Sequence, residues 1–234
     1  MYLIQQSTVF HNAQKWIRGA WLDTLNTPMN DMQFYVCWFK RILAMTNEQE
    51  RLRVIDALLH RTDPGEGGRY IALGDLQDFQ RHVVNHHTYA QDPGMLRSPH
   101  LFHDLYGLMM HFHGNHGWHN EYPIALNWVH CARTLYGTPL EVRIDDLQPG
   151  ARYMLQVTYP NMIAAGDTPM KIALYANGVL VHDTITPNAD PSHDPVYRYP
   201  LPQAVPADGI LTLTWQAYDT LYPVMVSELW LMRV

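Results

Sequence analysis

The densest group of side chains able to do chemistry is the run of histidines between residues 111 and 119. In an extended segment His111 and His113 would share one side, and His116 and His119 would follow after glycines. Neutral imidazole is a common ligand of zinc, copper, iron and nickel, and Glu121 would add a carboxylate. The His-Glu-x-x-His spacing of zinc proteases is absent. A divalent metal site at residues 111–121 is one prediction, and a structural or surface histidine run is the alternative.

A glycine-rich segment at residues 63–70, DPGEGGRY, interrupts regular structure. Its glycines permit positive φ angles and close approach of backbones. It lacks the Gly-Lys-Ser/Thr ending of a phosphate-binding loop. The segment is therefore either a compact connector or a ligand site, in which Asp63 and Glu66 supply carboxylates while Arg69 and Tyr70 contact the ligand.

Aromatic side chains are frequent, with 14 Tyr and 7 Trp in 234 residues. Flat rings match the apolar face of a pyranose sugar, so carbohydrate is the predicted ligand. The predicted stacking residues are Tyr70, Tyr89, Trp118, Tyr122 and Trp128. No pair of carboxylates is selected by its spacing, so no catalytic residue is assigned and enzymatic activity stays open.

The composition and charge of the chain limit the kinds of partner that it can bind. A net charge of −6 with only 16 Lys plus Arg disfavours nucleic acid, and no apolar run is long enough for a membrane helix. The start of the chain lacks a secretion signal, so we expect a cytoplasmic protein as written, or a secreted or periplasmic one if the chain is a fragment. Cys37 and Cys131 are expected to be buried thiols.

Calcium is the second metal that the sequence suggests. Five aspartates fall near predicted strand ends, where β-sandwiches bind Ca²⁺ through carboxylates and carbonyls. Solvated turn aspartates are the alternative. These residues are Asp145, Asp146, Asp183, Asp190 and Asp194.

The C-terminal part of the chain predicts the fold. Apolar and polar residues alternate in 153–159 and 211–215, which indicates strands with one buried face. Residues 170–177 and 224–231 are the other predicted strand segments. Asn177-Gly178 between apolar runs predicts a hairpin. We predict an α+β fold, with N-terminal helices packed on a C-terminal antiparallel β-sandwich of jelly-roll type. The predicted segments are 1–62 (helical), 63–137 (irregular, His-rich, ending in a helix) and 138–234 (the sandwich).

Helical periodicity predicts three helices in residues 8–60. The third begins at a capping box, residues 46–49, and turns Leu52, Ile55, Leu58 and Leu59 inward. Residues 75–124 are predicted to be irregular, with room for a short helix at 100–110. Residues 125–136 are predicted to be helical, with Gly137 as the cap. Residues 34–39 of the second helix are apolar on all sides, so we expect a partner chain or an upstream domain to cover Trp38. The alternative is that the two neighbouring helices and the sandwich cover it.

Several short motifs carry a family resemblance. The segments 63–74 (DPGEGGRYIALG), 130–140 (HCARTLYGTPL), 208–215 and 228–231 resemble, in this order, the C-terminal region of large, mostly uncharacterised bacterial proteins from carbohydrate-degrading organisms. The resemblance implies helices followed by a carbohydrate-binding type of sandwich, appended to a glycosidase-like body. It assigns no catalytic residue, and the His-rich stretch is not part of it.

Together these features predict a carbohydrate-associated accessory region, or a small subunit of a glycan-processing enzyme. Two other hypotheses stay open. One is a metal-dependent enzyme in its own right that uses residues 111–121. The other is a purely structural interaction module.

Overall fold

The computed structural model describes residues 40–60, 62–94, 96–103, 130–159, 171–183, 196–218, 220 and 223–234. The helices in these ranges are α4 (Lys40–Ala44), α5 (Glu48–Leu59) and α6 (Leu76–His82). The strands are β1 (Arg69–Ala72), β2 (His100–His103), β3 (His130–Arg133), β4 (Leu140–Ile144), β5 (Tyr153–Thr158), β6 (Ile172–Ala176), β7 (Val179–His182), β8 (Val196–Pro200), β9 (Leu211–Ala217), β10 (Met225–Val226) and β11 (Glu228–Arg233). Within the described ranges, no helix has the length and apolar character needed to cross a bilayer.

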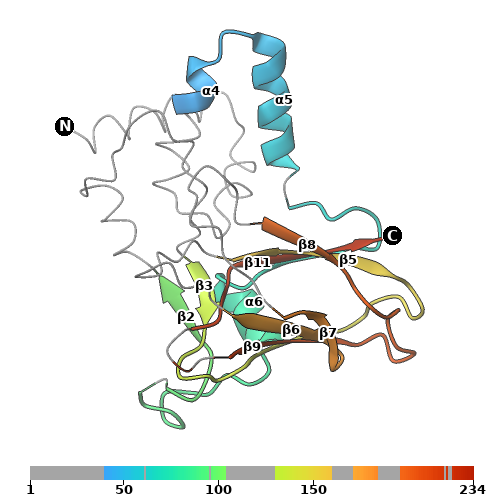
Figure 1. Ribbon diagram of the computed structural model, residues 1–234. Coiled ribbons are helices and arrows are strands. Elements are labelled where there is room, and N and C mark those ends of the chain that lie inside the picture. The colour runs from blue at the N-terminus through green and yellow to red at the C-terminus, as the bar shows by residue number, and fades with distance from the viewer. Residues whose placement is uncertain are drawn as a thin grey trace, which may run out of the picture.

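The strands form three antiparallel sheets. Sheet I has the order β1-β11-β5-β8, sheet II the order β4-β9-β6-β7, and the smaller sheet III the order β10-β3-β2. Figure 1 shows sheets I and II stacked one above the other. Eight strands are divided between these two sheets in the order of a double Greek key, which is the jelly-roll arrangement. The predicted antiparallel β-sandwich is confirmed. The first strand of sheet I, β1, comes from the segment 63–137 that was predicted to be irregular.

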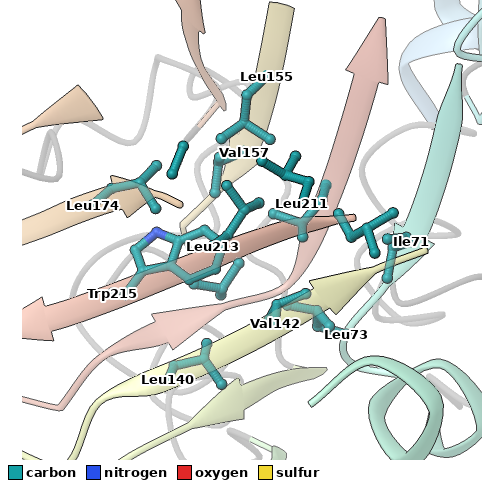
Figure 2. Packing of buried hydrophobic residues seen from close by; sticks show 14 of the residues in the cluster. Ile71, Leu73, Leu140, Val142, Leu155, Val157, Leu174, Leu211, Leu213 and Trp215 are labelled. Carbon is teal, nitrogen blue, oxygen red and sulfur yellow. The ribbon is translucent and has the colours of Figure 1, made fainter. Parts of the chain in front are cut away.

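The core lies between sheets I and II because alternate residues of each strand point into the same space. In β9 every second residue from Leu211 to Ala217 is buried, which is the pattern expected from the sequence. Figure 2 shows Trp215, Leu213 and Leu211 of sheet II meeting Leu155 and Val157 of sheet I. On one edge, α6 packs against β1 and β4 and adds Phe79 and Val83 to the same core.

The predicted hairpin at Asn177-Gly178 is confirmed. It joins β6 to β7, and both of its turn residues have positive φ angles, 48° and 78°. These angles define the type I′ turn, whose twist matches the twist of the two strands that it connects. The Asn177 side chain also accepts a hydrogen bond from the backbone N–H of Thr212 on β9, at 2.8 Å. The hairpin is therefore tied to the neighbouring strand.

The helix predicted for residues 125–136 is wrong where it is described, because residues 130–133 form strand β3. Leu126, Val129, Ala132 and Leu135 are spaced as on a helix face. β3 is instead fixed by pairing with β2 on one side and with β10 on the other. These partners lie far away in the sequence, and local periodicity contains no trace of them. For the same reason, the short helix allowed at 100–110 begins as strand β2. Residues 76–82, in a region predicted to be irregular, form a helix whose N-cap is Asp75.

The third predicted helix is confirmed as α5, with two corrections. Its N-cap is Asn47, not Thr46, because the Asn47 side chain accepts from the backbone N–H groups of Gln49 and Glu50. Leu52 was predicted to face inward, yet 57% of it is exposed. Arg51 donates hydrogen bonds to the carbonyls of Ile42 and Met45 at the end of α4. The charged face of α5 therefore contacts α4, and Leu52 is left in solvent. The end of the second predicted helix, which was expected to reach Met45, is confirmed as α4. The other residues of the first two predicted helices, including Trp38, lie outside the described residues.

The glycine-rich loop at residues 63–68 docks on the end of sheet I. The Tyr153 hydroxyl donates to the Gly67 carbonyl at 3.0 Å, and the Gly68 N–H donates to the Gly65 carbonyl. A Cβ atom at Gly68 would lie 2.6 Å from the Leu231 carbonyl oxygen. Only glycine fits at this position, because the two backbones approach so closely. The loop thus positions the start of β1 beside β11.

This close approach predicts that Gly68→Ala is strongly destabilising. The added methyl group must displace the backbone of Pro64 or of β11, which we expect to cost at least about 2 kcal/mol of unfolding free energy. Gly65→Ala is the matched control. Gly65 has a φ angle of +81° but no atom within 4 Å of an added Cβ. Gly65→Ala should therefore lose only roughly 1–2 kcal/mol of unfolding free energy, which is the cost of alanine at a left-handed φ angle. Urea denaturation measures the unfolding free energy of both variants. Equal losses would contradict the close approach of the Gly68 and Leu231 backbones.

Candidate functional site

The most developed polar site in the described residues lies between the free edges of sheets I and II. It is lined by strand β8 at the edge of one sheet and β7 at the edge of the other. We call its five ring-bearing residues the β7–β8 aromatic cluster. They are Tyr159, His182, Tyr197, Tyr199 and Trp215.

Strand alternation brings these rings together. Tyr197 and Tyr199 pair with Val157 and Leu155 of β5, so they point to the core side of sheet I. His182 pairs with Leu174 of β6, which points to the core side of sheet II. The two faces meet at this edge, where the His182 and Tyr199 rings lie 4.5 Å apart at an interplanar angle of 35°. The two half-buried rings form a tilted aromatic pair.

A chain of hydrogen bonds connects the His182–Tyr199 pair to the core. Trp215, which is fully buried, donates from Nε1 to the Tyr159 hydroxyl oxygen at 2.8 Å. The same hydroxyl lies 3.1 Å from His182 Nε2. An indole N–H can only donate, so the Tyr159 oxygen accepts from it and directs its own proton to His182. His182 therefore accepts at Nε2 and carries its proton on Nδ1.

The environment holds these groups in their neutral forms. Burial lowers the pKa of His182 to about 4, against a partial opposing effect of Asp183. Burial and the neighbouring Tyr197 raise the pKa of Tyr199 to about 12. The pKa of Tyr159 is raised well above its usual value, again chiefly by burial. At neutral pH the cluster presents apolar ring faces and uncharged polar atoms.

Of the residues predicted as ligand contacts, those in the glycine-rich loop are brought near one another but have structural partners. The Asp63 carboxylate accepts from the Gly65 N–H at 2.9 Å, and Arg69 donates to the carbonyls of Gly68 and Asp146. Glu66 is exposed. These contacts fit the connector interpretation of the loop better than the ligand site.

Tyr70 points to the opposite side of sheet I from the core. Its hydroxyl donates to the Glu228 carboxylate at 2.7 Å, and the second carboxylate oxygen accepts from Thr158 at 3.2 Å. The Tyr70 and Trp230 rings lie 5.1 Å apart. Glu228 is fully buried, and this polar contact was not predicted from the sequence. Tyr89, another predicted sugar contact, is 69% exposed.

The remaining predicted site residues lie outside the described residues. They are Trp118, Tyr122, Trp128, His111, His113, His116, His119 and Glu121. The predicted zinc site at residues 111–121 and the predicted enzymatic activity at that site therefore stay predictions. Among the residues that the structure does describe, no group of three or more His, Cys, Asp or Glu is placed to hold a metal ion.

The described aspartates of the calcium prediction have other roles. Asp145 pairs with Arg143 at 2.8 Å, Asp146 occupies a turn with a φ angle of 59°, and Asp183 is exposed at the end of β7. Asp190 and Asp194 lie outside the described residues.

Comparisons with known proteins add little. No protein-family model and no curated protein matches the chain. Among solved structures it is similar to the ANXUR2 extracellular domain from Arabidopsis thaliana, with a TM-score of 0.36 and 11% identity, over 47% of this chain and 29% of that chain. It is also similar to the CBM35 from Cellvibrio japonicus Abf62, with a TM-score of 0.32 and 16% identity, over 44% of this chain and 73% of that chain.

A family 35 carbohydrate binding module from an environmental isolate is similar to the same degree. The TM-score is 0.32 and the identity 13%, over 42% of this chain and 67% of that chain. The chain thus spans less than a third of the ANXUR2 domain. TM-scores of this size carry no argument, so the fold and the site rest on this chain's own strands and side chains.

The low pKa of His182 predicts that this residue makes stability depend on pH. Above pH 6.5, the usual value, the imidazole is neutral in both states. As the pH falls from 6.5 to about 4, the unfolded chain binds a proton that the folded chain still excludes, so stability falls across this window. His182→Gln keeps an acceptor for Tyr159 but does not titrate. Its unfolding free energy should fall less steeply over the window than that of the wild type.

The matched control is His60→Gln. His60 follows the end of α5 and is largely exposed, so its replacement should leave the wild-type slope nearly unchanged. Urea denaturation at several pH values measures all three proteins, and ¹⁵N NMR of the imidazoles reports the pKa of His182 directly. A His182 pKa near 6.5 would contradict the buried, neutral assignment.

Proposed function

We propose that this chain is a carbohydrate-binding β-sandwich that stacks a sugar ring on the β7–β8 aromatic cluster. In the same proposal it serves as an accessory region or small subunit of a glycan-processing enzyme. The supporting observation is the half-buried pair of rings from His182 and Tyr199, fixed from behind by Tyr159. A rigid ring surface loses little conformational entropy when a ligand covers it, which favours binding through stacking.

The polar atoms of the cluster support a neutral ligand. A sugar offers hydroxyl groups that both donate and accept, and the cluster supplies the Tyr199 hydroxyl beside the paired rings. His182 Nδ1 is covered from solvent, and the nearby Ile172 backbone raises the pKa of His182, so this nitrogen is not assigned to the ligand. An uncharged ligand suits the cluster, because no charge would have to be buried.

The same groups argue for binding rather than catalysis at this place. A general acid or base works best when its pKa lies near the working pH. His182, with a pKa of about 4, and Tyr199, with a pKa of about 12, both lie far from neutrality. Neither group gains or loses a proton readily at pH 7. The cluster is therefore suited to hold a sugar without cleaving it.

We expect Tyr199→Ala to weaken sugar binding by about tenfold or more, because one stacked ring is worth about 1.4 kcal/mol or more. A glycan array identifies the ligand, and calorimetric titration of that glycan then measures the affinity of each variant. Tyr199→Phe is the conservative partner. It keeps the ring and loses only the hydroxyl, so it should retain most of the affinity.

Tyr89→Ala is the matched control, since Tyr89 is an exposed tyrosine outside the cluster that was predicted as a sugar contact from the sequence. Its affinity should equal that of the wild type. If Tyr89→Ala loses binding and Tyr199→Ala does not, the site is elsewhere. If no plant, algal or bacterial glycan binds, the function itself is wrong, and the structural interaction module becomes the better hypothesis.

A further inference from the structure

The outward face of sheet III carries a second polar site, distinct from the aromatic cluster. His100 of β2 lies directly opposite Arg133 of β3, and Met225 of β10 lies on the other side of Arg133. Residues opposite one another in antiparallel strands point to the same face. The other face of this sheet carries Ala132 and Val226, which belong to the core. His100 and Arg133 therefore lie on the face away from that core as half-buried side chains, beside the buried Cys131 and Met225.

Both side chains leave a polar nitrogen without a hydrogen-bond partner. Among the described residues, His100 Nδ1 and Arg133 Nε are covered from solvent and have no partner in good geometry. The Ser98 carbonyl raises the pKa of His100 by its proximity, but it does not complete a hydrogen bond to Nδ1. Covered donors without acceptors are rare in folded proteins, since each one has lost its water without replacement.

The Arg133 guanidinium is held in place by an aromatic ring. Its central carbon lies 4.1 Å from the centre of the Phe102 ring, which covers one flat side of the group. The N–H donors of a guanidinium lie in its plane, so stacking leaves them available to an acceptor at the edge. The edge that includes Nε offers two parallel N–H groups, which is the geometry that matches the two oxygens of a carboxylate.

The charges nearby favour a monoanion. Arg133 carries one positive charge, and burial lowers the pKa of His100, so the imidazole is neutral at pH 7. Asp92 is the described carboxylate whose charge acts on His100, but its Oδ2 accepts from the Arg97 N–H and the Ser98 hydroxyl within its own loop. Asp92 would repel a dianionic phosphate more strongly than a carboxylate, and there is only one arginine to offset that repulsion.

We propose that His100 and Arg133 form a binding site for the carboxylate group of a small molecule. Arg133 donates to the carboxylate from its Nε edge, and His100 donates from Nδ1. Phe102 and Met225 supply apolar contacts beside the charged group. The ligand is either a sugar acid or a simple organic acid, since both present the same carboxylate. This site does not depend on the proposed sugar stacking at the β7–β8 cluster.

The test is a titration of the ¹⁵N-labelled full chain, observed by NMR at the Arg133 Nε–H and the His100 imidazole. Sodium acetate and sodium glucuronate are the two carboxylate probes, glucose is the neutral control, and sodium chloride keeps the ionic strength constant. We expect both signals to move and saturate, with a dissociation constant on the order of 1–10 mM for acetate. Tighter binding of glucuronate identifies a sugar acid, and equal binding identifies a simple acid.

Two variants locate the effect. Arg133→Lys keeps the positive charge but removes the parallel donors, so acetate affinity should fall by about tenfold or more. Arg143→Lys is the matched control at an exposed arginine already paired with Asp145, and it should bind as the wild type does. Arg133→Lys should leave binding of a neutral glycan unchanged, so failure of this site and failure of the aromatic cluster can be told apart.

Three outcomes would overturn the proposal. The first is no shift of the Arg133 and His100 signals in the wild type, a result that needs no variant to fold. The second is equal affinity of Arg133→Lys and wild type for acetate. The third is that a titration with sodium chloride alone moves both signals with the same affinity as acetate, because the site would then respond to negative charge alone.

Discussion

The buried indole of Trp215 is the constraint on which both the sandwich and its aromatic edge depend. Its ring fills the space between sheets I and II, while its N–H requires an acceptor where no water is present. Tyr159 supplies that acceptor, and its own proton then has to be directed to His182. One packing requirement in the core thus fixes the tautomer and the position of a histidine at the molecular edge. Loss of the Tyr159 hydroxyl would leave two polar groups unsatisfied.

The two long edges of the sandwich are closed by different means. On the β1–β4 edge, α6 places Phe79 and Val83 between the sheets, so that edge is sealed by aliphatic and phenyl groups. On the β7–β8 edge, the seal consists of tyrosines and a histidine, which carry polar atoms at their tips. Such rings exclude water from the core and still offer hydrogen bonds outward. This difference is why the second edge, and not the first, is the candidate for ligand binding.

The two proposed sites suit different ligands because their electrostatics differ. The aromatic cluster is neutral over the physiological range, since burial moves the pKa values of His182 and Tyr199 away from neutrality in opposite directions. The β2–β3 pair contains an arginine that is charged at every relevant pH and rests on the Phe102 ring. A neutral sugar fits the first, and a carboxylate fits the second.

The sequence by itself determined the elements whose signals are local. Alternation in residues 211–215 and 153–159 gave the buried faces of β9 and β5, and Asn177-Gly178 predicted a turn that requires two positive φ angles. Only the tertiary structure decided which strands pair. Residues 130–133 have helical spacing but form a strand, because β2 and β10 pair with them. Strand β8, which carries Tyr197 and Tyr199, was not predicted. His182 and Tyr199 meet because two separate sheets end at the same edge. Periodicity along the chain predicts which face of a strand a residue occupies. It does not predict which distant strand packs against that face.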